Sequence, residues 1–177
     1  MRAAVVREYG GVEVGDHPDP EPGPDEVVVE LRAAALNRRD TYVVSGTQPH
    51  PVPFVPGSDG AGVRRDTGDE VVILPSLAWG VREDAPGPGF RILGGPDDGT
   101  FAELVKVPRE NVFPKPRRLS WEEAAALPLA GLTAWRAIFG RGRLRSDETV
   151  LVLGAGGGVS TFVVQLAASE EIGRAHV

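Results

Sequence analysis

The sequence contains no cysteine. This absence excludes disulfide bonds, thiolate nucleophiles and every zinc or iron–sulfur site that cysteine side chains would hold. It is compatible with a cytoplasmic protein, because disulfides are rare in that compartment.

A basic surplus and a long apolar run are missing as well. The formal net charge is −6 and the pI is near 5.1, whereas a nucleic-acid-binding protein usually carries an excess of basic residues. No apolar run approaches the roughly 18 residues that a membrane-spanning helix needs, and Tyr9 and Gly10 come too soon for a signal peptide. Because 41% of the residues are hydrophobic and recur in patterned runs, we expect a soluble, cytoplasmic, globular protein without a nucleic-acid partner or a membrane segment.

The first two-thirds of the chain is predicted to be rich in β-strands. The run of Val27, Val28 and Val29 indicates a long strand that is buried on both faces. Short strands separated by turns at this spacing predict a small barrel or sandwich. The expected strands are residues 3–6, 12–14, 26–35, 57–63, 69–74 and 100–107, with a helical turn at 37–45, a proline-rich loop at 17–24 and a surface excursion at 76–99.

The pattern changes near residue 117. Ser120 with Glu123 three residues later is a capping box, which predicts a helix over 121–127. Pro128 can begin a second helix that runs to Phe139. A charged connector then leads to an apolar strand at 149–153, a glycine-rich turn and an apolar helix. Strand, glycine turn and helix in this order open a nucleotide-binding βαβ unit.

The end of the sequence does not fit the rest of that unit. A βαβ unit places its second strand about 30 residues after the first one begins, and we expect the chain to end at Val177 before that strand, as a C-terminally truncated protein. Residues 171–177 fit no continuation of the helix and look like the translated start of a common sequencing adapter, so we exclude them from fold reasoning. The alternative is a frayed helix end.

The glycine turn carries the strongest chemical signal. Its glycines permit a tight turn and let backbone N–H groups approach phosphate oxygens, and the following helix adds partial positive charge. Glycines also make ordinary turns, but here they stand between an apolar strand and an apolar helix. A G-x-x-G-x-x-small spacing fits better than G-x-G-x-x-G. The candidate cofactor-binding residues are Gly154, Ala155, Gly156, Gly157, Gly158, Val159 and Ser160.

Two further segments have ordinary explanations when each is taken alone. Residues 34–42 are typical of a strand that enters a helical turn, with Asp40 as a local cap. Residues 126–135 are typical of an apolar helix start, in which Thr133 would be a core-facing hydroxyl bonded to its own helix.

Together and in this order, these segments resemble the medium-chain dehydrogenase/reductase superfamily, and most closely its zinc-free quinone-oxidoreductase-like and zinc-binding-dehydrogenase-like members. The resemblance covers nearly all of residues 1–168. It implies an α/β fold with a β-rich N-terminal part: a GroES-like barrel domain over 1–117, then linker helices and the start of a Rossmann domain over 118–177. It also implies NAD or NADP, with NADP slightly favoured, in a cleft between the domains, and a homodimeric parent enzyme. Further carriers are residues 1–5, 55–62, 68–72 and 99–103.

The resemblance allows the catalytic zinc to be tested residue by residue. Zinc-bearing relatives have a cysteine where this chain has Asn37, a histidine where it has Ser58 and a third ligand where it has Leu129. Leucine cannot bind a metal, and an amide with a hydroxyl makes a poor zinc site. The lobe that holds a structural zinc in relatives corresponds to residues 76–99, which lack cysteine. We therefore expect no zinc.

Without zinc, other groups must polarise a substrate oxygen. The resemblance places Asn37 and Tyr42 near the nicotinamide, where either could hydrogen-bond that oxygen and stabilise enolate charge. Tyr42 could also donate a proton. Arg39 could add positive charge or be solvated, and Thr133 is expected to bond the nicotinamide or its ribose. His17, His50 and His176 are expected to be solvated and incidental, and residues 97–99 a turn rather than a cation site.

These expectations lead to three hypotheses about function. The first is hydride transfer between NAD(P)H and a quinone or enone, or between the cofactor and an alcohol or carbonyl substrate, both being small molecules. The second is a non-catalytic relative that keeps the cofactor site. The third is an inactive fragment, because most of the Rossmann domain is missing. The residue that separates NAD from NADP is expected roughly 20 residues past the glycine turn.

Overall fold

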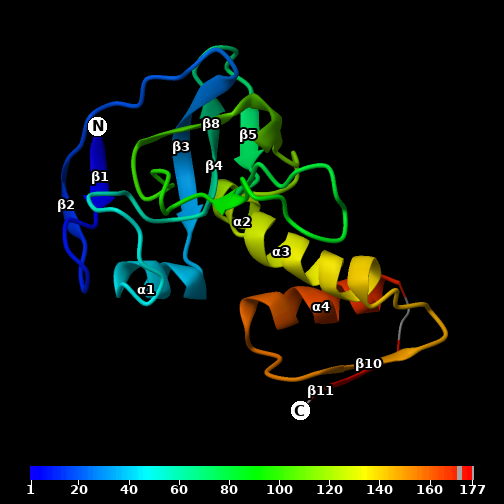
Figure 1. Cartoon of the computed structure of the whole chain (residues 1–177). Helices are drawn as coiled ribbons and strands as arrows, with labels where there is room; N and C mark the ends of the chain where they lie inside the picture. Colours follow the sequence, from blue (N-terminus) through cyan, green and yellow to red (C-terminus); the bar gives the residue numbers. More distant parts are fainter. Residues whose placement is uncertain (171–172, 177) are drawn as a thin grey trace. The chain divides into compact units, whose positions relative to one another are not determined.

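A five-stranded antiparallel sheet, curled into a half-barrel, forms most of the first part of the chain (Figure 1). The computed structural model describes residues 1–170 and 173–176, which divide into two compact units, Met1–Pro128 and Leu129–Val177. Each unit is described by itself. The sheet has the order β8 (Leu104–Pro108), β3 (Glu26–Ala35), β4 (Asp59–Arg64), β5 (Glu70–Ile73) and β9 (Val112–Pro114), and two smaller ladders pair β1 (Arg2–Val5) with β2 (Glu13–Asp16) and β6 (Ser76–Leu77) with β7 (Arg91–Ile92).

One face of this sheet supplies the main core. Val27 and Val29 are buried, whereas Val28 between them is only partly buried. The expectation that the valine run is buried on both faces is therefore wrong, because successive side chains of an antiparallel strand alternate between a core face and a wetter face. The core cluster comprises Val27, Val29, Val71, Ile73, Leu77, Leu93, Val105 and Val107.

The segment 76–99 is more than a surface excursion. Leu77 and Leu93 lie near its two ends, and both are buried in the core cluster. The short β6–β7 ladder closes the excursion between them. The carbonyl of Asp97 accepts hydrogen bonds from the N–H groups of Gly94 and Gly95, and the chain bends over residues 93–97, immediately before the end of the predicted turn at 97–99.

Helix α1 (Arg38–Val44) follows β3 directly, as the sequence predicts. Asn37 is its N-cap residue, and the chain leaves the helix through Ser45 and Gly46. Gly46 has φ +78, and a Cβ at this position would lie 2.7 Å from the ring of Tyr9. Glycine is required there for both its conformational freedom and its small size.

Helix α2 (Trp121–Ala125) confirms the capping box. Ser120 Oγ accepts a hydrogen bond from the N–H of Glu123 at 3.1 Å, and the Glu123 carboxylate accepts one from the N–H of Ser120 at 2.8 Å. Ala124 and Ala125 then pack against Ala61 of β4. The predicted second helix is α3 (Pro128–Trp135), which continues as a π-helix over Arg136–Arg141.

The second unit contains a βαβ arrangement. Strand β10 (Thr149–Val152) leads through the glycine turn into α4 (Gly158–Ser169), and β11 (Gly173–His176) pairs in parallel with β10 (Figure 1). The expectation that the chain ends before a second strand is wrong, because Thr149 already pairs with Gly173. The crossover is shorter than expected because α4 has only 12 residues. Residues 171, 172 and 177 of the suspected adapter segment lie outside the described residues.

No helix within the described part of the chain is long and apolar enough to span a membrane. The core of the second unit is formed by Ala134, Ile138, Val152 and Val163.

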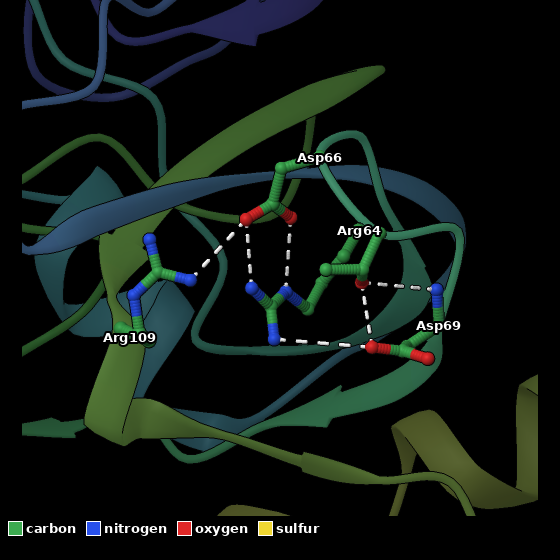
Figure 2. Close-up of polar contacts among 5 residues, drawn as sticks. Arg64, Asp66, Asp69 and Arg109 are labelled. Carbon is green, nitrogen blue, oxygen red and sulfur yellow. Dashed lines mark hydrogen bonds and ion pairs between the residues drawn. The ribbon is translucent and has the colours of Figure 1, made fainter.

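A network of ion pairs holds the turn between β4 and β5. Figure 2 shows the Asp66 carboxylate between Arg64 and Arg109, with Arg64 Nη2 at 2.7 Å and Arg109 Nη1 at 3.2 Å. These contacts, led by the hydrogen bond from Arg64, lower the pKa of Asp66 from 3.8 to about 2. Asp69 lies on the far side of Arg64 at 3.9 Å. The network joins the β4–β5 turn to the segment that precedes β9.

The substitution Asp66→Asn is expected to lower the Tm, because it removes the negative charge that both arginines share. A lowered folded-state pKa means that this contribution is fully present above pH 3.8 and is lost as the pH falls toward about 2. The Tm difference between wild type and variant, followed by circular dichroism, should therefore vanish at the acid end and shrink in high salt. Asp147→Asn, which breaks an ion pair that is 69% exposed on both sides, is the control. Equal effects of the two substitutions would contradict the network.

Replacing Ser120 by alanine should lower the free energy of unfolding by about 1 kcal/mol, because the N–H of Glu123 loses its acceptor. Ser169→Ala, at the exposed end of α4, removes a hydroxyl that donates to the carbonyl of Leu166 three positions earlier. This variant should change the free energy of unfolding by less than about 0.5 kcal/mol. Urea unfolding measures both. A Ser120→Ala variant as stable as Ser169→Ala would show that the cap does not stabilise α2.

Candidate functional site

Asn37, one of the two predicted catalytic residues, lies where β3 passes into α1. The Asn37 side chain donates from Nδ2 to Asp59 Oδ2 at 3.0 Å, and its backbone N–H donates to Asp40 Oδ2 at 2.6 Å. Asp59 is 1% exposed, and its carbonyl accepts a hydrogen bond from Thr100 Oγ1 at 2.8 Å. The Asn37 carboxamide is therefore fixed through its nitrogen to the first residue of β4.

Arg39 is not solvated, which answers a question that the sequence left open. Its Nη1 donates to Ser58 Oγ at 3.2 Å and to the carbonyls of Leu93 at 3.2 Å and Gly94 at 3.4 Å. Its Nη2 donates to the carbonyls of Ile92 at 3.3 Å and Gly95 at 3.0 Å. Burial lowers the pKa of Arg39, although the nearby Asp40 charge opposes this shift.

Ser58 is completely buried, and its hydroxyl both donates and accepts a hydrogen bond. It donates to the carbonyl of Leu93 at 2.8 Å and accepts from Arg39. Asp40, in the first turn of α1 and next to Arg39, is 5% exposed. One of its carboxylate oxygens accepts from Asn37, and Oδ1 has no hydrogen-bond partner among the described residues. Burial raises the pKa of Asp40, opposed by the Asn37 hydrogen bond and by Arg39.

The expectation that the histidines are solvated is wrong for two of them. His50 Nε2 is buried without a partner in the described part of the chain, and the ring packs edge-on against Phe54 at 6.0 Å between centroids. Burial lowers the pKa of His50, and the Arg39 charge lowers it further. The His17 side chain is 16% exposed, with Nε2 at 3.1 Å from the Asp98 carboxylate. The His176 side chain lies outside the described residues.

Tyr42, the other predicted catalytic residue, is 40% exposed on α1. Its hydroxyl accepts a long hydrogen bond of 3.5 Å from Arg38 Nε, and this contact raises the pKa of Arg38. No hydrogen bond joins Tyr42 to Asn37 in the described residues. The structure thus places the two residues on one short segment without pairing them.

The glycine turn has the backbone that a phosphate site needs. Gly154 adopts φ +63, and the N–H of Gly157 closes the turn on its carbonyl at 2.9 Å. A Cβ on Gly154 or on Gly156 would meet nothing within 4 Å, so the space above the turn is open. Gly157 is the N-cap residue of α4. Ser160 Oγ donates to the carbonyl of Leu153 at 3.2 Å, which fits the expected small residue between helix and strand.

Thr133 lies on α3 in the second unit. Its hydroxyl donates to the carbonyl of Leu129 at 2.7 Å, as the simpler alternative predicted, but the residue is exposed rather than core-facing. A threonine hydroxyl that donates to its own helix can still accept a hydrogen bond from a ligand.

The residues at the expected zinc positions do not fit zinc. Leu129 offers no ligand atom, the Asn37 nitrogen is bonded to Asp59, and the Ser58 hydroxyl lies between a carbonyl and a guanidinium. A cation 3.2 Å from Ser58 Oγ would repel a second, divalent one. No cluster of three His, Asp or Glu side chains suitable for a metal occurs in the part of the chain that the structure describes.

Sequence reasoning missed the partners that organise this site. Asp59, Thr100 and Ser58 contact α1 or its neighbours across more than fifteen positions of the sequence. No local periodicity indicates such contacts. The one available signal is the paired polar residues Ser58 and Asp59 inside a glycine-rich strand start, where polar side chains are buried only with partners.

Comparison with known proteins now gives the family. The alcohol dehydrogenase GroES-like domain family matches residues 23–117, more than half of the chain. A zinc-type alcohol dehydrogenase-like protein of Schizosaccharomyces pombe is 38% identical over 81% of this chain and 45% of its own length. Mouse quinone oxidoreductase is 34% identical over 94% of this chain and 49% of its own.

Solved structures agree with the sequence relatives. A crystal structure of an NAD-dependent alcohol dehydrogenase matches with a TM-score of 0.93 and 43% identity, over 99% of this chain and 57% of its own. The chain spans about half the length of the curated relatives it matches. The curled antiparallel sheet is the GroES-like half-barrel that the sequence predicted. The chain belongs to the medium-chain dehydrogenase/reductase superfamily, through its alcohol dehydrogenase GroES-like domain.

Proposed function

We propose that this protein is a zinc-independent NAD(P)-dependent oxidoreductase, which transfers hydride between nicotinamide and a quinone or enone, or an alcohol or carbonyl substrate. The observation that carries the proposal is the open glycine turn between β10 and α4 in a chain with a GroES-like domain. The relatives named as quinone oxidoreductase and alcohol dehydrogenase support it.

The glycine turn would hold the pyrophosphate of the cofactor. Backbone N–H groups at the start of α4 can donate to phosphate oxygens, and the helix dipole favours negative charge there. Open space above Gly154 and Gly156 lets the ligand approach the backbone closely. Thr133 would accept or donate a hydrogen bond to the nicotinamide or its ribose. The bound nicotinamide supplies the hydride chemistry.

Asn37 is the proposed residue for binding the substrate oxygen. One of its amide hydrogens is donated to Asp59, which fixes the carboxamide and leaves the second hydrogen for a ligand. A preorganised donor of this kind stabilises negative charge that develops on a carbonyl oxygen. The exposed Tyr42 hydroxyl is the proposed proton donor.

The zinc-free assignment is part of the proposal. It is supported by the chemistry of Asn37, Ser58 and Leu129 and by the guanidinium beside Ser58. Removing divalent metal with a chelator should therefore leave turnover unchanged. Loss of turnover that zinc alone restores would contradict the assignment.

The second candidate function is a cofactor-binding protein without catalysis. The observation that favours it is that no hydrogen bond joins Tyr42 to Asn37 among the described residues, so the two proposed catalytic groups are not paired. Oxidation of NADPH and of NADH, followed by nicotinamide absorbance with a panel of quinones, enones and aldehydes, separates the two functions. Turnover supports the oxidoreductase. Tight cofactor binding without turnover of any compound supports the second function, and no binding of either nucleotide contradicts both.

The substitution Gly156→Val should weaken binding of the nicotinamide cofactor by on the order of tenfold or more, equivalent to about 1.4 kcal/mol, because the side chain fills space that the phosphate needs. The added Cβ would meet no atom within 4 Å among the described residues, so the Tm should stay unchanged. Gly15→Val, equally free of contacts in β2, is the matched control. Isothermal titration with NADPH and NADH measures both, and equal affinities would contradict a phosphate site at this turn.

Replacing Asn37 by alanine should lower kcat by about 10²–10³-fold, the usual effect of losing one oxyanion donor. If the Tyr42 hydroxyl donates the proton, Tyr42→Phe should lower kcat less at low pH than at high pH, because at low pH the solvent can supply the proton. Steady-state kinetics across pH, with the Tm of each variant as a check on folding, provide the test. Wild-type turnover in both variants would refute the assignment of these residues.

A further inference from the structure

The guanidinium of Arg39 lies in a cage made only of neutral oxygens. Four consecutive backbone carbonyls, from residues 92 to 95, and the Ser58 hydroxyl accept its hydrogen bonds at 3.0 to 3.4 Å. No ion pair joins Arg39 to a carboxylate within the described residues, and the adjacent Asp40 directs an oxygen to the N–H of Asn37 instead. Arg39 is therefore a half-buried cation whose hydrogen bonds go to neutral oxygens among the described residues, while the Asp40 charge acts on it without a direct ion pair.

Such a ligand set is familiar for metal ions. Carbonyl and hydroxyl oxygens converging on one positive charge are the donors that hard cations take in proteins. Burying a charge is costly unless its hydrogen bonds are replaced, and here all four Nη hydrogens find acceptors. The Arg39 guanidinium therefore binds the carbonyls of this loop as a metal cation would, but it is a side chain of α1.

The loop that it holds requires glycine at two positions. Gly94 and Gly95 adopt φ +87 and +137, and a Cβ on Gly94 would lie 2.4 Å from the carbonyl of Gly57. The loop therefore presses directly on the residue before Ser58. Ser58 is bonded to the loop and to Arg39, and its neighbour Asp59 holds the Asn37 carboxamide.

We propose that Arg39 is a positioning residue, a built-in cation that orders residues 92–95 and Ser58 and thereby fixes Asn37 for its substrate. The step from Ser58 to substrate rests on the proposed function, whereas the cage does not. Removing the side chain leaves the oxygen acceptors in the chain but not their order, and a free guanidinium ion should bind them and restore that order.

The test is chemical rescue of Arg39→Ala by guanidinium chloride, at concentrations far below those that unfold proteins. The variant should have a lower Tm and altered amide NMR signals for Gly94 and Gly95. Low guanidinium should raise its Tm and return those signals, whereas urea, a neutral molecule of the same shape, and sodium chloride should not. Arg91→Ala is the matched control, because Arg91 is an exposed arginine at the same loop that pairs with Asp97; no rescue is expected there.

A second pair of variants covers the case in which Arg39→Ala does not fold. Arg39→Lys keeps the charge and Arg39→Gln keeps only neutral donors, so the lysine variant should retain more of the Tm and more of kcat, with KM unchanged. Wherever turnover is measurable, its recovery should follow the same guanidinium dependence as the Tm. Failure of all turnover would refute the proposed function but not the cage.

Three results would overturn the proposal. They are a wild-type Tm and spectrum for Arg39→Ala, equal rescue by urea and guanidinium, and equal behaviour of the lysine and glutamine variants. Each would show that the positive charge does not organise this loop.

Discussion

A single side chain on α1 organises the β-rich unit around its candidate site. The five hydrogen bonds of the Arg39 guanidinium join the helix to the end of the long excursion and to the start of β4. Because Asp59 follows Ser58 directly, the same junction determines where the Asn37 amide lies. This chain has no cysteine. The hydrogen bonds of Arg39 connect distant segments, as disulfides or bound metals do in other small domains.

The second unit depends on a different constraint, the tight glycine turn between β10 and α4. Gly154 supplies the positive φ that turns the chain from β10 toward α4, and Gly157 caps the helix. Ser160 completes the packing by bonding the end of the strand. The positive φ at this turn costs little conformational energy, since glycine adopts it freely. The turn also leaves backbone N–H groups at the start of α4 that could donate to an anion.

The sequence predicts what local chemistry determines. The local cap at Asp40, the Ser120 capping box and the strand–turn–helix at Gly154 were all predicted, because each depends on residues a few positions apart. The cage around Arg39 was not, since its acceptors are backbone carbonyls more than fifty positions away and carry no side-chain signal. For the same reason the burial of His50 Nε2 was missed. Strand β11 was missed because residues 171–177 were set aside as an adapter and a longer crossover was expected.

The central claim is that this family member binds a nicotinamide nucleotide at the turn between β10 and α4. Amide NMR spectra of the protein, recorded during titration with NADPH and with NADH, test it most directly. The account predicts saturable shifts concentrated on residues 154–160, with Gly156 and Gly157 among the largest. An absence of shifts at these residues at saturating nucleotide, in a protein whose spectrum shows the second unit folded, would contradict it.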